Sequence, residues 1–265
     1  GKNGTVKFLH GAGGTAMGEM IKDFILPNFT KKKAGTIGLD MLDDGGSVDL
    51  GNGKELILTT DSHLVQPLFF PGGDIGRLAV SGTINDIAVM GARPLALTCS
   101  LIIEEGFSLN KLEKILNSMD ETLKEADTPI ITGDTKVLKS GELDGVIVNT
   151  AGIGISERPI SDSGSCPGDK IIINGTIGDH GMALMQHREG LTFQSRLVSD
   201  VAPLNGIISK ILSMEGVNAM KDPTRGGLAE SLNEMAEKSG TGILIYEEKI
   251  PIKEETKGIA DLIRS

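Results

Sequence analysis

Aromatic residues and positive charge are both scarce in this chain. Aromatics make up 3% of its 265 residues, with no Trp and one Tyr, and Asp plus Glu outnumber Lys plus Arg by 36 to 26. Proteins that bind single-stranded nucleic acid stack bases on aromatic side chains and attract phosphates with basic ones. The net charge of −10 repels phosphates instead. The composition therefore argues against nucleic acid as a partner.

Cysteines and long apolar runs are also lacking. The two cysteines, Cys99 and Cys166, have neither a metal-binding spacing nor the number that a disulfide framework needs. No segment has the composition of a signal peptide, and no apolar run is long enough to span a bilayer. These absences predict a cytoplasmic protein with no membrane partner.

Glycine, by contrast, is abundant. The 36 glycines cluster in loops without a fixed period, while hydrophobic residues make up an ordinary 39%. A chain of this length can form two domains. Residues 156–167 are rich in Ser, Pro and Gly, so we place a linker there, between domains at 1–155 and 168–265. The helical pattern at 254–265 reaches the last residue without a polar tail, which predicts an incomplete second domain.

The most apolar helical pattern lies within residues 72–97. Asp74 can cap the start of this helix and Gly91 can end it. Asn85 and Asp86 are polar positions inside the pattern, and a buried carboxylate must be paired, hydrogen-bonded or metal-bound. Either this polar pair bridges to a neighbouring loop, or Asp86 belongs to an acidic site.

The remaining elements follow from hydrophobic periodicity and turn residues. A hairpin is predicted at 48–58, because Asn52-Gly53 is a strong turn signal. Further strands are predicted at 38–42, 95–103, 129–136, 143–155, 170–175 and 242–246. Helices are predicted at 17–25, 108–125, 182–187, 202–214, 228–238 and 254–265. Strands and helices alternate without the regular spacing of a dinucleotide-binding sheet, so an α/β (α+β) class is expected.

Acidic residues recur where the predicted strands and helices meet Gly-rich turns. They are Asp43, Asp44, Asp61, Asp86, Asp134 and Asp222. Clustered carboxylates repel one another unless a hard cation is present, and Mg²⁺ binds oxygen ligands together with substrate phosphates. The Gly-rich loop at 10–14 could cradle phosphate, although it lacks the Lys-Ser/Thr of a P-loop, and Lys136 adds a cation. These features predict an ATP site, and the alternative is a set of dispersed surface acids.

Several motifs resemble the HypE family of hydrogenase maturation proteins. They are HGAGG, LDMLDDGG, TTDSHLVQPLFFPGGDIGRLAVSGTINDIAVMGA, ITGDTKV, GTIGDHGMALMQHREG and AMKDPTRGGLAESLNE, in this order from residue 10 to residue 234. That family belongs with aminoimidazole ribonucleotide synthetase, selenophosphate synthetase and thiamine monophosphate kinase. The resemblance implies a two-domain aminoimidazole ribonucleotide synthetase-like fold and a homodimer whose N-terminal strands form a barrel.

The resemblance also implies a reaction. Proteins of this family dehydrate a carbamoyl group on their own C-terminal Cys with ATP, forming a thiocyanate whose cyanide goes to the iron of [NiFe]-hydrogenase. The implied partners are a carbamoyl-transferase maturation protein of HypF type and iron-scaffold proteins of HypC and HypD type.

Site residues carry over by motif. The implied Mg²⁺ ligands are Asp44, Asp61, Asp86 and Asp222. The implied ATP or phosphate contacts are His10, Gly11, Gly13, Gly14, Asn85, Asp134 and Thr224. Lys136 would orient the carbamoyl thioester and His63 is a second catalytic candidate. His180 and His187 could cover phosphates or could pack at helix ends.

One departure from the family concerns the acceptor thiol. Members continue into a tail that ends in Cys, whereas Cys99 and Cys166 match no tail position, so a shortened chain is expected. Two alternatives are a sibling enzyme and a non-catalytic maturation scaffold. A sibling such as selenophosphate synthetase expects a reactive Cys or selenocysteine with a Lys in the loop at 10–14, and this loop has neither.

Overall fold

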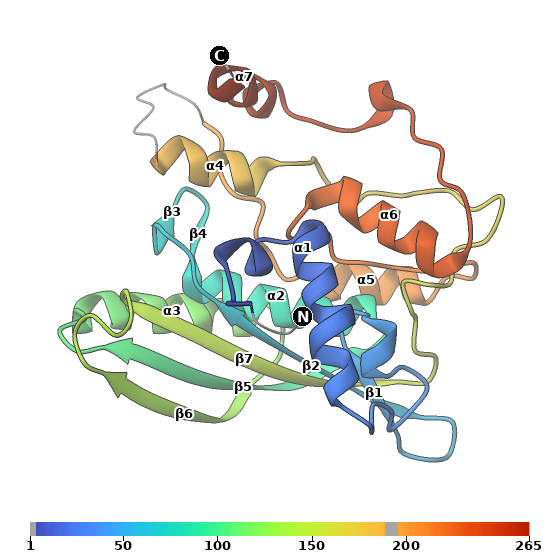
Figure 1. Cartoon of the computed structure of the whole chain (residues 1–265), viewed down its shortest axis with the longest axis horizontal. Helices are drawn as coiled ribbons and strands as arrows, with labels where there is room; N and C mark the ends of the chain where they lie inside the picture. The colour runs from blue at the N-terminus through green and yellow to red at the C-terminus, as the bar shows by residue number, and fades with distance from the viewer. Residues whose placement is uncertain (1–3, 189–195, 265) are drawn as a thin grey trace.

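A five-stranded sheet forms the centre of the protein in this computed structural model, which describes residues 4–188 and 196–264 (Figure 1). The strand order is β1-β2-β7-β5-β6. The strands are β1 (Gly46–Asp49), β2 (Glu55–His63), β5 (Arg93–Glu104), β6 (Ile130–Leu138) and β7 (Val146–Ser156). All neighbours pair antiparallel except β5 and β6, which are parallel. Mixed pairing with helices on the sheet confirms the α/β (α+β) class.

The predicted buried helix is α2 (Ile75–Val89), which lies across the sheet. The Asp74 carboxylate accepts hydrogen bonds from the backbone N–H of Gly76 at 2.7 Å and of Arg77 at 3.0 Å, so the expected cap is confirmed. Gly152 on β7 allows the close approach of α2, because a Cβ there would lie 2.5 Å from Ile87 Cδ1. Residues of β7 alternate between this buried face and the opposite face.

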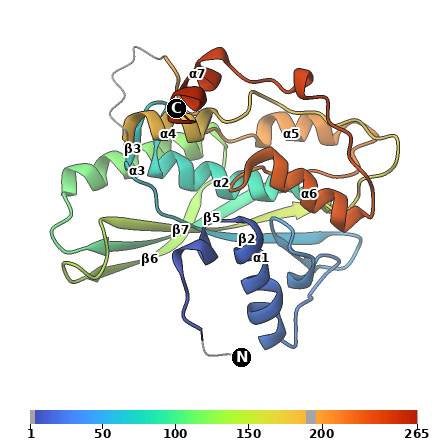
Figure 2. The same ribbon diagram turned by 45° about the horizontal axis from the view of Figure 1, so that its top comes forward.

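Helices cover the two faces of the sheet unequally. In Figure 2, α2 and α3 (Leu109–Glu125) lie on one side, with the C-terminal helices beyond them. In the part of the chain that the structure describes, only the N-terminal segment lies near the other side (Figure 2). That segment comprises η1 (Phe8–Gly11), α1 (Gly14–Glu19), η2 (Met20–Ile25) and η3 (Leu26–Asn28). We call the uncovered side the free face of the sheet.

Local turn signals hold in the N-terminal half. The hairpin of β1 and β2 turns at Asn52 and Gly53, both with positive φ, as predicted. The strand predicted at 38–42 is wrong. A 3-10 turn, η4 (Leu39–Met41), ends there at Leu42 with φ of 54°, and this left-handed residue breaks an extended run. A short pair, β3 (Phe69–Phe70) and β4 (Gly73–Asp74), precedes α2.

The C-terminal half is helical in the residues that the structure describes. It contains α4 (Asp179–Arg188), α5 (Asn205–Leu212), α6 (Gly227–Ser239), η5 (Glu247–Lys249) and α7 (Glu254–Arg264). The strands predicted at 170–175 and 242–246 are wrong, because neither segment pairs with a neighbouring strand among the described residues, and a strand needs such a neighbour. The helix predicted at 254–265 is confirmed to Arg264, and Ser265 lies outside the described residues.

The length and composition of the helices bear on membrane insertion. Within residues 4–188 and 196–264, no helix is both long and apolar enough to cross a bilayer.

Candidate functional site

All four predicted metal ligands converge from separate segments, and we call them the acidic cluster: Asp44, Asp61, Asp86 and Asp222. Asp61 lies on β2 and Asp86 on the helix α2 that packs against it. The Thr59 hydroxyl lies 2.8 Å from the Asp44 carbonyl oxygen and 3.1 Å from Asp86 Oδ2. The backbone N–H of Asp222 donates to Asp44 Oδ2 at 3.3 Å. The cluster therefore joins a loop, a strand, a helix and the segment before α6.

Burial raises three of the four pKa values in the acidic cluster, and repulsion between its carboxylates adds to this effect for Asp86 and Asp222. Burial, followed by repulsion from Asp44, Asp222 and Asp61, raises the pKa of Asp86 to about 9. Burial and the charges of Asp44 and Asp61 raise the pKa of Asp222 to about 7, and burial raises the pKa of Asp44. Lys221 offsets this effect only in part for Asp44 and Asp222, so a divalent cation would favour the ionised forms of these carboxylates.

Asp61 differs from the other three because a histidine contacts it. His63 Nε2 lies 3.1 Å from Asp61 Oδ2. Burial raises the pKa of Asp61, but the hydrogen bond and charge of His63 outweigh burial and hold this pKa below its usual value. His63 is 8% exposed, and its Nδ1 has no hydrogen-bond partner among the described residues. The histidine therefore keeps one carboxylate of the cluster ionised.

The Gly-rich loop at 10–14 lies against the segment that carries Asp222. The backbone N–H of Gly14 donates to Glu230 Oε1 on α6 at 2.8 Å. A Cβ at Gly13, where φ is 82°, would lie 2.7 Å from Arg225 Cγ. Figure 1 shows α1 next to α6 accordingly. Arg225 in turn attracts Asp61 and helps to lower its pKa. The predicted phosphate loop and the acidic cluster are thus neighbours through Arg225, a residue that sequence reasoning did not single out.

Several predicted phosphate contacts bind the protein's own backbone in this structure. His10 Nδ1 accepts from the N–H of Lys7 at 3.0 Å. The carbonyl of Thr224 accepts from the N–H of Gly227, which turns the chain into α6. Asn85 donates to the carbonyl of Ala202 at 3.0 Å and accepts from an N–H in the same loop. This is the bridging arrangement that was the alternative for the polar pair, and it applies to Asn85 but not to Asp86.

His180 and His187 lie at the two ends of α4. His180 Nδ1 is 2.8 Å from Ser199 Oγ, and its ring meets Phe70 edge-on. Burial lowers the pKa of His180. The contacts of His180 match helix-end packing, the second of the two interpretations. His187 is exposed.

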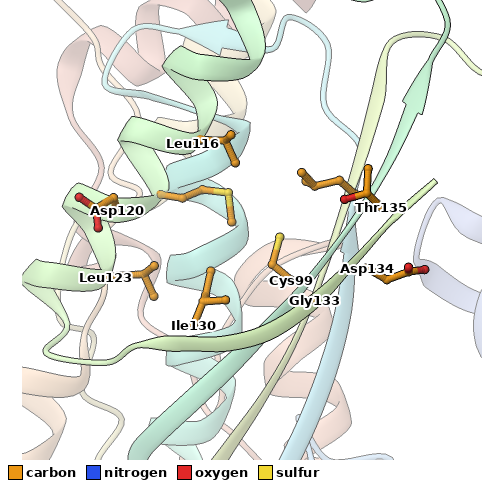
Figure 3. A pocket seen from close by; sticks show the side chains of 10 residues that line it. Cys99, Leu116, Asp120, Leu123, Ile130, Gly133, Asp134 and Thr135 are labelled. Carbon is orange, nitrogen blue, oxygen red and sulfur yellow. The ribbon is translucent and has the colours of Figure 1, made fainter. Parts of the chain in front are cut away.

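Asp134 and Lys136 do not meet the acidic cluster within one chain. Both are exposed on β6, at the edge of the sheet. Asp134 pairs with Ser100 on β5, and Ser100 pairs with Asn149 on β7. Strand β2, which carries Asp61, lies beyond β7, so β6 and β2 are three strand spacings, or about 14 Å, apart. In Figure 3, Asp134 points away from α3, whereas Cys99 points toward it. Their roles stay predictions that need a second chain or another ligand.

Asp43 also lies outside the acidic cluster, although it neighbours Asp44. Its carboxylate accepts from the N–H of Asp162 at 2.8 Å and from Ser161 Oγ at 3.0 Å. The two neighbouring acids therefore serve different contacts: Asp43 binds the segment after β7, and Asp44 belongs to the acidic cluster.

The acidic cluster is not a complete metal cage. Across residues 4–188 and 196–264, no three His, Cys, Asp or Glu side chains lie close enough together to hold one ion. Mg²⁺ in nucleotide sites commonly takes one or two carboxylates and completes its shell with phosphates and water. The donor set therefore fits Mg²⁺ that arrives with a nucleotide.

Two family descriptions cover most of this chain. Residues 42–156 match AIR synthase related protein, N-terminal domain, and residues 166–265 match AIR synthase related protein, C-terminal domain. A thiamine monophosphate kinase from Aquifex aeolicus, 18% identical, superposes on 97% of this chain and 82% of its own with a TM-score of 0.71. This likeness shows a shared fold.

Closer relatives are hydrogenase maturation proteins. A putative hydrogenase expression/formation protein of Methanocaldococcus jannaschii is 56% identical over 260 residues, which are 96% of this chain and 76% of the relative. The carbamoyl dehydratase HypE of Rhizobium leguminosarum bv. viciae is 46% identical over 267 residues, 98% of this chain and 74% of the relative.

Solved HypE structures agree with these relatives. One from a HypE–HypF complex is 46% identical, with a TM-score of 0.85 over 92% of this chain and 78% of that one. HypE in complex with ATP is 39% identical, with a TM-score of 0.78 over 98% of this chain and 76% of that one. The chain therefore belongs to the HypE family of hydrogenase maturation proteins, within the AIR synthase-related proteins.

Proposed function

We propose that this chain is an ATP-dependent carbamoyl dehydratase that serves [NiFe]-hydrogenase maturation. The substrate is an S-carbamoyl cysteine, and the products are a thiocyanate, ADP and phosphate. The carbamoyl oxygen takes the γ-phosphoryl group, then leaves as phosphate while the nitrogen gives up both protons. Phosphorylation matters because an amide oxygen is otherwise a poor leaving group. The observation that carries the proposal is the acidic cluster beside the Gly-rich loop, in a chain of the HypE family.

The acidic cluster is proposed to hold Mg²⁺ together with the ATP phosphates. Asp86 and Asp222, whose pKa values are raised to about 9 and about 7, need the added positive charge most. Asp61 is already ionised beside His63, so it offers a first contact for the cation. Mg²⁺ bound there would spread the charge of the phosphates during transfer.

The phosphates are proposed to lie between the Gly-rich loop and the turn at 222–227. Backbone N–H groups of residues 11–14 and the Thr224 hydroxyl can donate to phosphate oxygens, and Arg225 can pair with them. Gly14 would exchange its contact with Glu230 for a phosphate when nucleotide binds.

A homodimer is proposed on the free face of the sheet. Leu58 on β2 is 47% exposed on this face. On the adjoining edge strand, β6, Ile131 is 65% exposed and Val137 is 64% exposed. A second copy would cover these side chains and the unpaired edge of β6. Asp134 and Lys136 would then act on a nucleotide or thioester that reaches the dimer interface.

The protein partners are proposed from the relatives. A HypF-type carbamoyl transferase would load the cysteine, as the solved HypE–HypF complex suggests. HypC- and HypD-type iron scaffolds would receive the cyanide. Both cysteines of this chain are free, which suits the reducing cytoplasm that we propose as its compartment.

The cysteines of this chain are poor carriers for the carbamoyl group. Cys99 is half-buried in an open cavity of about 510 Å³ between α3 and β6 (Figure 3), and burial raises the pKa of its thiol. Cys166 is exposed, but it lies in the short segment before residue 170, and its backbone N–H is bound to Asp169. A flexible tail ending in Cys delivers substrate at a far higher effective concentration.

Mass spectrometry tests the proposal. The chain, alone and with an appended Cys-ending tail, is incubated with a HypF-type partner, carbamoyl phosphate and then Mg-ATP. We expect a carbamoyl adduct on the tail that loses the mass of water only when ATP is added. An adduct that ATP leaves unchanged would favour the scaffold alternative, and an adduct on Cys166 that dehydrates would refute the carrier argument.

A further inference from the structure

A buried ion network lies beside the acidic cluster, and the proposed chemistry does not use it. It consists of Asp43, Asp162, Lys221 and Lys238. The Asp162 carboxylate, in a residue 1% exposed, accepts from Lys221 Nζ at 2.8 Å and from Lys238 Nζ at 2.8 Å. The backbone N–H of Asp162 donates to the Asp43 carboxylate at 2.8 Å. This network joins the segment before β1, the segment after β7 and the C-terminal half.

Two adjacent pairs of residues connect the ion network to the acidic cluster. Asp43 belongs to the network and Asp44 to the cluster, while Lys221 belongs to the network and Asp222 to the cluster. Lys238 Nζ adds a hydrogen bond of 2.7 Å to the carbonyl of Leu42. Because neighbours share a backbone, holding one member of each pair fixes where the other can place its oxygens.

Lys221 also lies where it can compete with a metal ion. Its Nζ is 2.8 Å from Asp162 and 3.1 Å from Glu234, and only 3.7 Å from Asp44 Oδ1. The Lys221 side chain is 10% exposed, so its charge needs protein partners. Asp162 supplies the closest one and holds the ammonium on the network side of Asp44.

We propose that Asp162 is a positioning residue for cation binding at the acidic cluster. It fixes the positions of Asp44 and Asp222 relative to each other. It also prevents Lys221 from pairing with the Asp44 oxygen that a cation would bind. Asp162 contacts none of the reacting groups itself. The inference rests on the proposed function, because it assumes that the acidic cluster binds Mg²⁺ with a nucleotide.

Calorimetry on Asp162→Asn tests this role. Mg²⁺ is titrated into the chain saturated with a non-hydrolysable ATP analogue, and the analogue is titrated separately without Mg²⁺. We expect Mg²⁺ to bind about 10–100-fold more weakly, as for other residues that orient metal ligands, with unchanged metal-free binding of the analogue. The matched control is Asp169→Asn, an exposed carboxylate of the same segment that contacts Cys166 and Asn218, and it should bind Mg²⁺ as the parent chain does.

The outcomes separate the inference from the proposed function. Folded Asp162→Asn that binds Mg²⁺ as tightly as the parent chain, while Asp86→Asn loses it, overturns the inference alone. Retention of Mg²⁺ by both variants overturns the proposed cation site as well. Equal weakening of metal-free and Mg²⁺-dependent binding would indicate a purely structural role and also overturns the inference.

A second variant covers the case in which Asp162→Asn does not fold. Lys238→Gln removes one of the two ammonium groups that hold the Asp162 carboxylate in place, together with the contact to the Leu42 carbonyl next to Asp43. Weaker Mg²⁺ binding by folded Lys238→Gln supports the inference, and unchanged binding overturns it.

Discussion

Replacing Asp86 by Asn should stabilise the metal-free chain and abolish its response to Mg²⁺. The pKa of Asp86 is about 9, against an ordinary 3.8. Between these values the folded chain keeps a proton that the unfolded chain has released, so the free energy of unfolding falls as pH rises. Asn carries no charge and nearly the same shape, so the variant should lose this pH dependence.

The size of the effect follows from the pKa shift. A pH of 7 lies about three units above the ordinary pKa that Asp86 has in the unfolded chain. At about 1.4 kcal/mol per unit, keeping Asp86 protonated in the folded chain lowers the free energy of unfolding by at most about 4 kcal/mol. Asp44, Asp61 and Asp222 share the titration with Asp86, which reduces what one substitution can recover. We therefore expect Asp86→Asn to raise the free energy of unfolding by about 1–3 kcal/mol at pH 7 without metal.

Urea unfolding between pH 5 and pH 8 measures this effect, first without metal and then with Mg²⁺ and an ATP analogue. Compared with the analogue alone, added Mg²⁺ should stabilise the parent chain and leave the stability of the variant unchanged. The control is Asp144→Asn, an exposed carboxylate before β7 that should behave as the parent chain does. A variant less stable than the parent at pH 7 without metal, or one with the full gain from Mg²⁺, would refute the reasoning.

Three further predictions concern packing, assembly and the thiol. Gly152→Ala should lower the free energy of unfolding by about 1–3 kcal/mol, since its Cβ meets Ile87 and Leu97, whereas Gly175→Ala meets nothing within 4 Å; urea denaturation compares them. Leu58→Asp on the free face should leave the chain folded but monomeric by light scattering, and a variant that stays dimeric would exclude this face as the interface. Cys166→Ser should leave Mg-ATP affinity unchanged in calorimetry, and a clear loss would place this thiol near the nucleotide.

The elements that sequence predicted well are those with local signals. Asn52-Gly53 specifies the hairpin turn, and Asp74 specifies the start of α2, because each acts within a few residues. The segments at 170–175 and 242–246 have strand-like composition, but a strand depends on a neighbour that composition does not reveal.

The residues of the candidate site were likewise predicted from the sequence only in part. The acidic cluster was found by residue type and by family motif, and Asp86 stood out because a carboxylate is rare in so apolar a helix. The ion network was missed, because Asp162 and Lys221 lie 59 positions apart in irregular segments with no periodic pattern. The placement of Asp134 on an edge strand required the strand order, which one sequence does not contain.

The contact between the Gly-rich loop and α6 has a consequence for how the protein is made. Gly14 and Glu230 are 216 positions apart, and Asp44 and Asp222 are 178 apart. Contacts of such long range form late, and chains leave the ribosome from the N-terminus. The sheet with Asp61 and Asp86 can thus fold while Asp222 is still unsynthesised. A nascent chain therefore remains unable to assemble the proposed nucleotide site until the segment with Asp222 and Glu230 has emerged.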